Sequence, residues 1–142
     1  MQRLLFSMVC AALIATSAPA QAGKLYIGVD ISSQRMVVKD GAAEYTWVVS
    51  TGRKGWPTPT GKFRVTRLER EFLASNFENA PMPYSVFINY RRGYAIHGTT
   101  EPGRLGTPVS HGCVRLLIKD AAKLFALVRK HGMRNVDVVI TR

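Results

Sequence analysis

The sequence has few cysteines and few acidic side chains. Its 142 residues contain only Cys10 and Cys113, and 9 acidic side chains stand against 20 lysines and arginines. After the apolar stretch at residues 4–15 there is no second long apolar run, no internal repeat and no low-complexity tract. These absences exclude a disulfide-stapled scaffold, a protein with several membrane-spanning helices and a repeat array.

The N-terminal residues 1–22 have the features of an export signal. A basic residue precedes the apolar stretch, which is too short to span a bilayer comfortably, and small residues follow up to Ala22. We expect cleavage after Ala22, so that residues 23–142 form the mature domain and Cys10 is lost. An uncleaved membrane anchor is the alternative. The protein is therefore expected in the periplasm or cell wall.

The mature chain is strongly basic. Without Arg3 it has 19 basic against 9 acidic side chains, a formal net charge of +10. Such a charge raises nucleic acid as a partner, but an exported protein rarely meets nucleic acid, and the basic residues are scattered. Anionic envelope polymers are the expected partners, attracted over long range.

The hydrophobic pattern predicts a mainly β domain with one packed helix. Apolar residues at Leu25, Ile27 and Val29 alternate, and Asp40-Gly41 is a hairpin signal. Apolar positions at helical spacing predict a helix over about residues 120–131, with Asp120 at its start and Gly132 at its stop. The expected strands cover residues 25–30, 36–39, 45–50, 63–67, 84–90, 94–97 and 136–141.

Two long loops are rich in glycine and proline. They cover residues 50–61 and 99–109, and the second leads directly to Cys113. Long irregular loops in a small domain tend to carry function. Residues 69–83 are ambiguous and predict either a third loop or a short helix that ends before Pro81.

Cys113 is the candidate nucleophile because an exported chain with one remaining thiol cannot pair it internally. A thiol reacts as thiolate and needs a base within hydrogen-bond reach. His97 and His111 are both candidates, and spacing alone does not choose between them. In an extended segment His111 and Cys113 would share one face, and the N–H groups of Gly112 and Cys113 would point toward an oxyanion.

Four further residues are candidate substrate contacts. Arg115 carries a guanidinium suited to a substrate carboxylate, although a surface ion pair would also explain it. Ser110 supplies a hydroxyl for a direct contact or for a turn. Trp56 and Tyr84 are large enough to line a groove, although aromatic side chains of this size more often lie in the core.

These residues fall into a pattern that resembles a known active-site signature. The blocks His97-Gly98 and Ser110-His111-Gly112-Cys113-Val114-Arg115-Leu116, separated by the eleven residues 99–109, closely resemble that of the L,D-transpeptidase catalytic domain (YkuD-like). Ser50-Thr51-Gly52 with Thr58-Pro59-Thr60-Gly61-Lys62-Phe63 is similar to that family's second recurring segment. The resemblance covers about residues 24–142 and implies a mixed-sheet, β-sandwich-like fold.

The resemblance also implies a role for each matching residue. Cys113 corresponds to the acylated nucleophile and His97 to the general base. Gly98 corresponds to the position whose carbonyl orients that histidine, and His111 and Gly112 shape the oxyanion site. Arg115 corresponds to a position near the substrate.

The implied reaction is acyl transfer on peptidoglycan stem peptides. The thiol attacks the third residue of a tetrapeptide stem, a diamino acid, and the terminal D-alanine leaves. The thioester then passes to an amine of another stem or of an outer-membrane protein lysine. Alternatives are hydrolysis of the same acyl-enzyme by an L,D-carboxypeptidase or amidase, a cysteine endopeptidase, and a non-catalytic wall-binding module. No metal or other cofactor is expected, because the sequence does not space three tetrahedral ligands for zinc.

Overall fold

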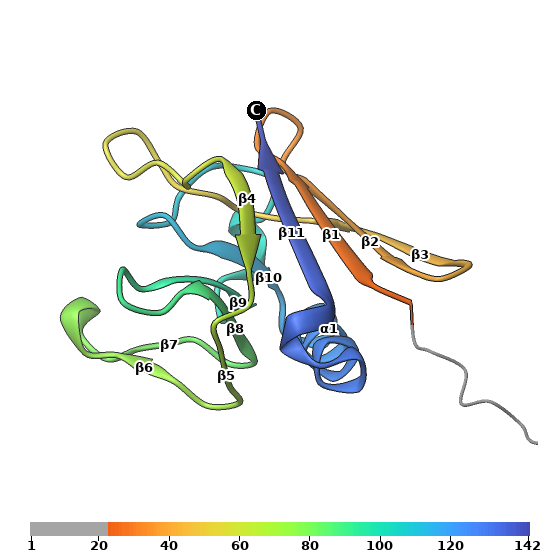
Figure 1. The fold of residues 1–142 in the computed structure, drawn as a ribbon. Coiled ribbons are helices and arrows are strands. Elements are labelled where there is room, and N and C mark those ends of the chain that lie inside the picture. The colour runs from red at the N-terminus through yellow and green to blue at the C-terminus, as the bar shows by residue number, and fades with distance from the viewer. Residues whose placement is uncertain (1–22) are drawn as a thin grey trace, which may run out of the picture.

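A computed structural model describes residues 23–142 of the chain (Figure 1). The expected signal segment, residues 1–22, lies outside the described residues, and its cleavage stays a prediction. The described part contains two packed β-sheets, a short β-ribbon and one α-helix, in agreement with the predicted mainly β class. No helix in residues 23–142 is long and apolar enough to cross a bilayer.

The first sheet has five strands in the order β3-β2-β1-β11-β4. The predicted hairpin is confirmed, because β2 and β3 are antiparallel and Gly41 takes a φ of 58° at the turn. The last strand runs parallel to the first, with Leu25 beside Val136, so both ends of the domain meet in the sheet centre. The strands are β1 (Leu25–Asp30), β2 (Arg35–Asp40), β3 (Ala43–Val48), β4 (Gly61–Arg64) and β11 (Val136–Thr141).

The second sheet has four strands in the order β10-β9-β8-β5. Strands β9 and β10 are parallel, while β8 pairs antiparallel with β9 and with β5, so both sheets are mixed. One continuous hydrophobic core joins the inner faces of the two sheets. The strands are β5 (Arg67–Glu69), β8 (Ser85–Asn89), β9 (Tyr94–Thr99) and β10 (Val114–Leu117).

The helix α1 (Ile118–His131) follows β10 without a loop and buries Leu124 and Val128 in the shared core. It begins two residues earlier than expected, so Asp120 lies in its first turn rather than at its start. Gly132 follows its last residue, as predicted for the stop, but its φ of 81° and ψ of 138° lie outside the left-handed helical conformation expected there. At this end His131 Nε2 lies 2.8 Å from Asp40 Oδ1, which ties the helix to the β2–β3 hairpin.

Residues 69–83 form neither a plain loop nor an α-helix. They fold into a two-stranded ribbon of β6 (Leu73–Ala74) and β7 (Ala80–Pro81), joined by the short 3-10 helix η1 (Ser75–Phe77). Two consecutive residues with positive φ, Glu78 and Asn79, reverse the chain after η1. The sequence pattern missed this ribbon because each strand has only two residues. The remaining 3-10 helices are η2 (Pro102–Arg104) and η3 (Met133–Asn135).

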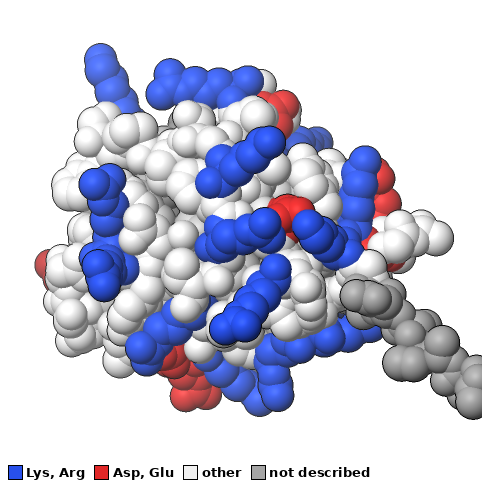
Figure 2. All heavy atoms as spheres, in the orientation of Figure 1, with Lys and Arg blue, Asp and Glu red and all other residues white. Residues whose placement is uncertain are grey.

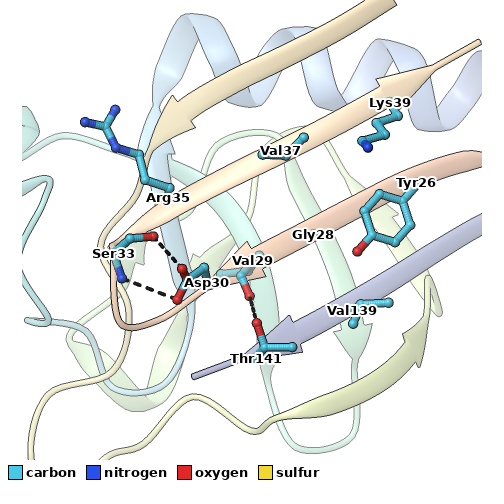
Figure 3. Close-up of a pocket in the computed structure, with 10 residues that line it drawn as sticks. All are labelled: Tyr26, Gly28, Val29, Asp30, Ser33, Arg35, Val37, Lys39, Val139 and Thr141. Atoms are coloured by element: carbon cyan, nitrogen blue, oxygen red, sulfur yellow. Dashed lines mark hydrogen bonds between the residues drawn. The ribbon is translucent and has the colours of Figure 1, made fainter.

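The face shown in Figure 2 is basic without one dominant basic patch. Lysine and arginine side chains are spread over the face shown in Figure 2, with few acidic side chains between them. The outer face of the five-stranded sheet has a hollow of about 350 Å³ whose floor is Gly28, with Val37 and Val139 on either side (Figure 3). This outer hollow ends at Tyr26 on one side and at Asp30 on the other (Figure 3).

Candidate functional site

The parallel pairing of β9 with β10 brings the predicted site residues together. Arg115 lies in register with His97, while Ile96 and Val114 form the next pair and point into the core. Side chains alternate along a strand, so His97 and Arg115 point away from the core. Cys113 precedes β10, two residues before Arg115, and packs against a small second cluster that includes Ala95.

His97 is a buried, neutral imidazole. Its side chain is buried, and this burial lowers its pKa to about 4, with the Arg115 charge acting in the same direction. Nδ1 lies 2.7 Å from the Gly98 carbonyl oxygen, which only accepts hydrogen bonds. Nδ1 therefore carries the proton, and Nε2 has a free lone pair. Gly98 thus stands where the motif expects the group that orients the histidine.

Cys113 is held as a protonated thiol. Burial raises its pKa, although the Ala95 N–H group and the Arg115 charge partly oppose that effect. The sulfur donates a hydrogen bond of 3.3 Å to the Gly93 carbonyl, in the turn between β8 and β9. A neutral imidazole together with a protonated thiol is the resting state expected of an enzyme in which a general base activates the nucleophile by removing its proton.

His111 does not lie on an extended segment with Cys113. Gly112 between them has a φ of 114°, so the alternation expected for a strand does not apply. The His111 ring stacks on Phe77 at a centroid distance of 4.4 Å and meets Trp56 edge-on at 5.0 Å. Burial lowers the pKa of His111, and Arg53 and Arg115 lower it further. These contacts connect the β6–β7 ribbon to the loop that holds the thiol.

Ser110 organises the backbone around Cys113. Its buried hydroxyl donates to the Cys113 carbonyl at 2.6 Å and accepts from the Gly112 N–H at 3.1 Å. The Gly112 N–H is thus engaged within the loop, and its expected role toward an oxyanion stays a prediction. A Cβ atom on Gly112 would lie 2.6 Å from the Tyr94 ring, so the position also requires glycine sterically.

The second motif segment, which begins at Ser50, is hydrogen-bonded to the loop that carries Cys113. Ser50 and Arg115 exchange two backbone hydrogen bonds of 3.0 and 2.8 Å, and the Ser110 N–H bonds to the Thr51 carbonyl at 3.0 Å. The Gly52 N–H is bound by Thr58 Oγ1 at 2.8 Å. The two segments that carry the resemblance are about 60 residues apart in sequence and contact each other directly.

The thiol and both histidines line a cleft of about 690 Å³. Its walls are the β6–β7 ribbon, which lies at the lower left of Figure 1, the turn at residues 90–93 and residues 99–101. Trp56 lines it, as predicted, with 46% of its surface exposed. The prediction for Tyr84 is wrong, because its ring packs edge-on against Phe125 of α1 and does not line the cleft.

Sequence reasoning missed three groups of the cleft. Phe77 supports His111, the Gly93 carbonyl accepts a hydrogen bond from the thiol, and Glu101 lies 3.2 Å from Arg115. None of them belongs to the motif, and each reaches the site through a turn or ribbon that long-range pairing positions. Among residues 23–142 no group of three or more His, Cys, Asp or Glu side chains is arranged to hold a metal ion.

Comparison with known proteins places this geometry in a family. The chain is 29% identical over 121 residues to Bacillus subtilis YciB, whose L,D-transpeptidase assignment is provisional; the match covers 75% of this chain and 62% of YciB. An L,D-transpeptidase from Stackebrandtia nassauensis has a similar structure, with a TM-score of 0.71, 25% identity, and coverage of 91% of this chain and 62% of that one. L,D-transpeptidase 3 from Mycobacterium tuberculosis, in complex with a faropenem-derived adduct, gives a TM-score of 0.72 at 22% identity, with coverage of 84% and 60%.

The chain spans about three fifths of the length of each of these relatives. The profile of the L,D-transpeptidase catalytic domain (YkuD) matches residues 24–140, which is nearly all of the described region. The chain therefore belongs to the L,D-transpeptidase catalytic domain family.

Proposed function

We propose that this protein is an exported, cysteine-dependent L,D-transpeptidase of the cell wall. The observation that carries the proposal is that a buried, neutral His97, oriented by Gly98, and the protonated thiol of Cys113 line the same cleft. Family membership supports the reaction class, and the signal-like residues 1–22 support location in the periplasm or cell wall.

The first half-reaction forms a thioester. His97 Nε2 accepts the Cys113 proton while sulfur attacks the carbonyl carbon of the third stem residue. The oxyanion is stabilised by the Cys113 N–H, since Ser110 already binds the Gly112 N–H. The carbon–nitrogen bond to D-alanine then breaks, and the leaving amine takes the proton from His97.

The second half-reaction transfers the acyl group to an amine. The acceptor nitrogen gives its proton to His97 as it attacks the thioester, and sulfur leaves and is reprotonated. The acceptor is an amine of a second stem or a lysine of an outer-membrane protein. If water attacks instead, the same acyl-enzyme yields a carboxypeptidase or amidase product.

Intact-protein mass spectrometry tests the nucleophile. Mature protein from Gly23 is incubated with faropenem, the compound class bound by the mycobacterial relative, and Cys113→Ala serves as the control. We expect a covalent adduct on the wild type and none on the variant. An adduct on both proteins would place the nucleophile elsewhere.

Incubation with disaccharide-tetrapeptide tests the reaction. A dimer that has lost one D-alanine, absent with Cys113→Ala, establishes transpeptidation. Tripeptide without dimer indicates hydrolysis or a missing protein acceptor, which an added lysine-bearing outer-membrane protein would reveal. Binding to wall sacculi without any Cys113-dependent turnover would favour the wall-binding module and contradict the proposal.

The basic surface suggests how the enzyme stays at the wall. Spread positive charge attracts anionic envelope polymers without a shaped contact, and salt screens such attraction within about 10 Å at 0.1 M. Retention on sacculi is therefore expected to fall as salt rises. Retention that does not depend on salt would contradict this targeting.

A further inference from the structure

Glu101 and Arg115 form an ion pair inside the cleft. Arg115 Nη1 lies 3.2 Å from Glu101 Oε2, and both side chains line the cleft with Cys113 and His97. Glu101 is the acidic residue among the described lining residues, whereas Arg91 and Arg92, which also line the cleft, make no ion pair within residues 23–142. The cleft thus holds one paired positive and negative charge.

The pair lies beside the reacting groups. The Arg115 charge lowers the pKa of His97, His111 and Cys113, so its guanidinium is close enough to act on all three. Glu101 is fixed by its backbone, because its N–H bonds to Thr99 Oγ1 at 3.0 Å and its carbonyl accepts from the Arg104 N–H at 3.2 Å. The backbone of Glu101 is therefore held at the rim of the cleft that contains the thiol, and the bond to Arg115 positions its carboxylate.

Most of the hydrogen-bonding capacity of the pair is unused. A guanidinium carries five N–H donors and a carboxylate about four acceptor sites. Within the described residues the contact between Nη1 and Oε2 is the single side-chain hydrogen bond of either group. Arg115 therefore keeps donors for an anion and Glu101 keeps acceptors for a cation, a few ångströms apart.

Stability does not account for the arrangement. The side chain of Glu101 is 53% exposed, and an ion pair at this exposure contributes about 0–1 kcal/mol to folding. A receptor for a carboxylate alone would also be weakened by an adjacent glutamate, because like charges repel. The arrangement instead matches a ligand that carries both signs of charge on neighbouring atoms.

We propose that Glu101 and Arg115 together bind a zwitterionic amino-acid head group, an ammonium and a carboxylate on one carbon. The carboxylate binds the free N–H groups of Arg115 and the ammonium binds the free oxygen of Glu101. The inference rests on the proposed function and applies to stems whose third residue is diaminopimelate, the diamino acid whose side chain ends in such a group. The pair then selects a stem by the end of this side chain, away from the attacked carbonyl.

Three matched donors test the proposal. They are tetrapeptide stems with diaminopimelate at the third position, with the side-chain end free, N-acetylated on its amine, or amidated on its carboxylate. The wild type is compared with Glu101→Gln and Arg115→Gln, and Glu71→Gln is the control because Glu71 is exposed and does not line the cleft. Ratios of kcat/KM between donors within one variant cancel any effect of Arg115 on His97 and Cys113.

We expect the wild type and Glu71→Gln to prefer the free donor over either blocked donor by about tenfold, the scale of one charged hydrogen bond. Glu101→Gln should lose the preference against the N-acetylated donor and keep the preference against the amidated donor. Arg115→Gln should show the reverse. Equal use of all three donors by the wild type, or unchanged ratios in Glu101→Gln, would overturn the proposal.

A binding measurement separates this inference from the proposed reaction. Calorimetric titration of Cys113→Ala with tripeptides that carry the same three side-chain ends needs no turnover. Discrimination in binding without turnover by the wild type would leave the head-group site standing and remove the transpeptidase. Turnover by the wild type without discrimination in either assay would remove the site alone.

Discussion

The cleft and the outer hollow are both formed on a sheet face turned away from the shared core, yet they differ in the state of their polar groups. In the outer hollow Asp30 is bound by the hydroxyls of Ser32 and Ser33, and these bonds lower its pKa. In the cleft burial moves the pKa of His97 down and that of Cys113 up. One hollow holds a satisfied carboxylate, and the other holds a base and a thiol that are both kept neutral.

The contrast shows that a concave surface does not by itself make a reactive site. The hydrogen bonds from Ser32 and Ser33 stabilise the ionised form of Asp30, so Asp30 stays deprotonated near neutral pH and does not act as an acid or a base. His97 and Cys113 lose solvation when charged, and they regain stabilisation only when a reaction passes the proton and charge to substrate. Changes in the cleft should therefore affect chemistry, and matched changes in the outer hollow should not.

The largest expected effect is the loss of the general base. His97→Gln should lower kcat/KM for faropenem acylation by about 10²–10⁴-fold, because the thiol proton loses its acceptor. His111→Gln, which removes the rival base, should have a much smaller effect, since its ring serves as an aromatic contact. Stopped-flow acylation measures both. A larger loss in His111→Gln would reverse the assignment.

The pH profile sharpens the same assignment. His97 acts only when neutral, so wild-type kcat/KM should fall below a pH of about 4 rather than below the ordinary 6.5. In His97→Gln the residual rate should rise with pH through the thiol pKa, which burial has raised above its usual 9.0. Between pH 6.5 and about 4 the unfolded chain binds a proton at His97 and the folded chain does not. The free energy of unfolding therefore decreases as the pH is lowered through this range. Circular dichroism must therefore accompany each acid measurement.

The second effect contrasts two glycines. Gly112→Ala in the cleft forces alanine into a φ of 114° and places its Cβ 2.6 Å from a Tyr94 ring carbon. We therefore expect the free energy of unfolding to fall by about 2 kcal/mol or more. Gly28→Ala in the outer hollow meets the Tyr26 ring at 2.9 Å, but that exposed ring is free to move aside. Urea unfolding should show a change below about 1 kcal/mol there. Equal losses would contradict the comparison.

The sequence predicted several strands, the helix and one hairpin because each has a local signal, whereas the β-sandwich-like arrangement was expected only from the family resemblance. Alternating apolar residues gave β1, helical spacing gave α1, and Asp40-Gly41 gave the hairpin. The thiol and the buried histidine came from the two short blocks of the signature, His97-Gly98 and residues 110–116, and the choice of His97 over His111 came from the family resemblance. These features depend on residues close in the chain, and hydrophobic periodicity reports such features directly.

The parts that the sequence did not predict depend on long-range geometry. Phe77 supports His111 only because the β6–β7 ribbon folds over the cleft, and Tyr84 turns to Phe125 because α1 packs behind it. The extended form expected for residues 111–113 failed because Ser110 captures the Gly112 N–H and Gly112 takes a positive φ. Hydrophobic periodicity does not predict a hydrogen bond between a side chain and the backbone such as this one.

The smallest expected effect contrasts two serines. Ser110→Ala removes the acceptor of the Gly112 N–H and the donor to the Cys113 carbonyl in a buried setting, so unfolding free energy should fall by about 1–3 kcal/mol. Ser33→Ala removes an exposed hydrogen bond to Asp30, and water takes the place of the lost hydroxyl. The free energy of unfolding should therefore change by about 0.5 kcal/mol or less.

The Ser110 change should also slow acylation at constant folded fraction, because the loop that holds Cys113 loses two of its hydrogen bonds. Ser33→Ala should leave the acylation rate at the wild-type value. The acylation rate is measured with faropenem at a temperature about 10 degrees below the melting temperature of the less stable variant. All variants are then folded, so a lower rate reports on the reaction and not on unfolding. A Ser110→Ala enzyme that acylates at the wild-type rate would show that the Cys113 backbone is held by the Ser50–Arg115 and Ser110–Thr51 backbone bonds alone.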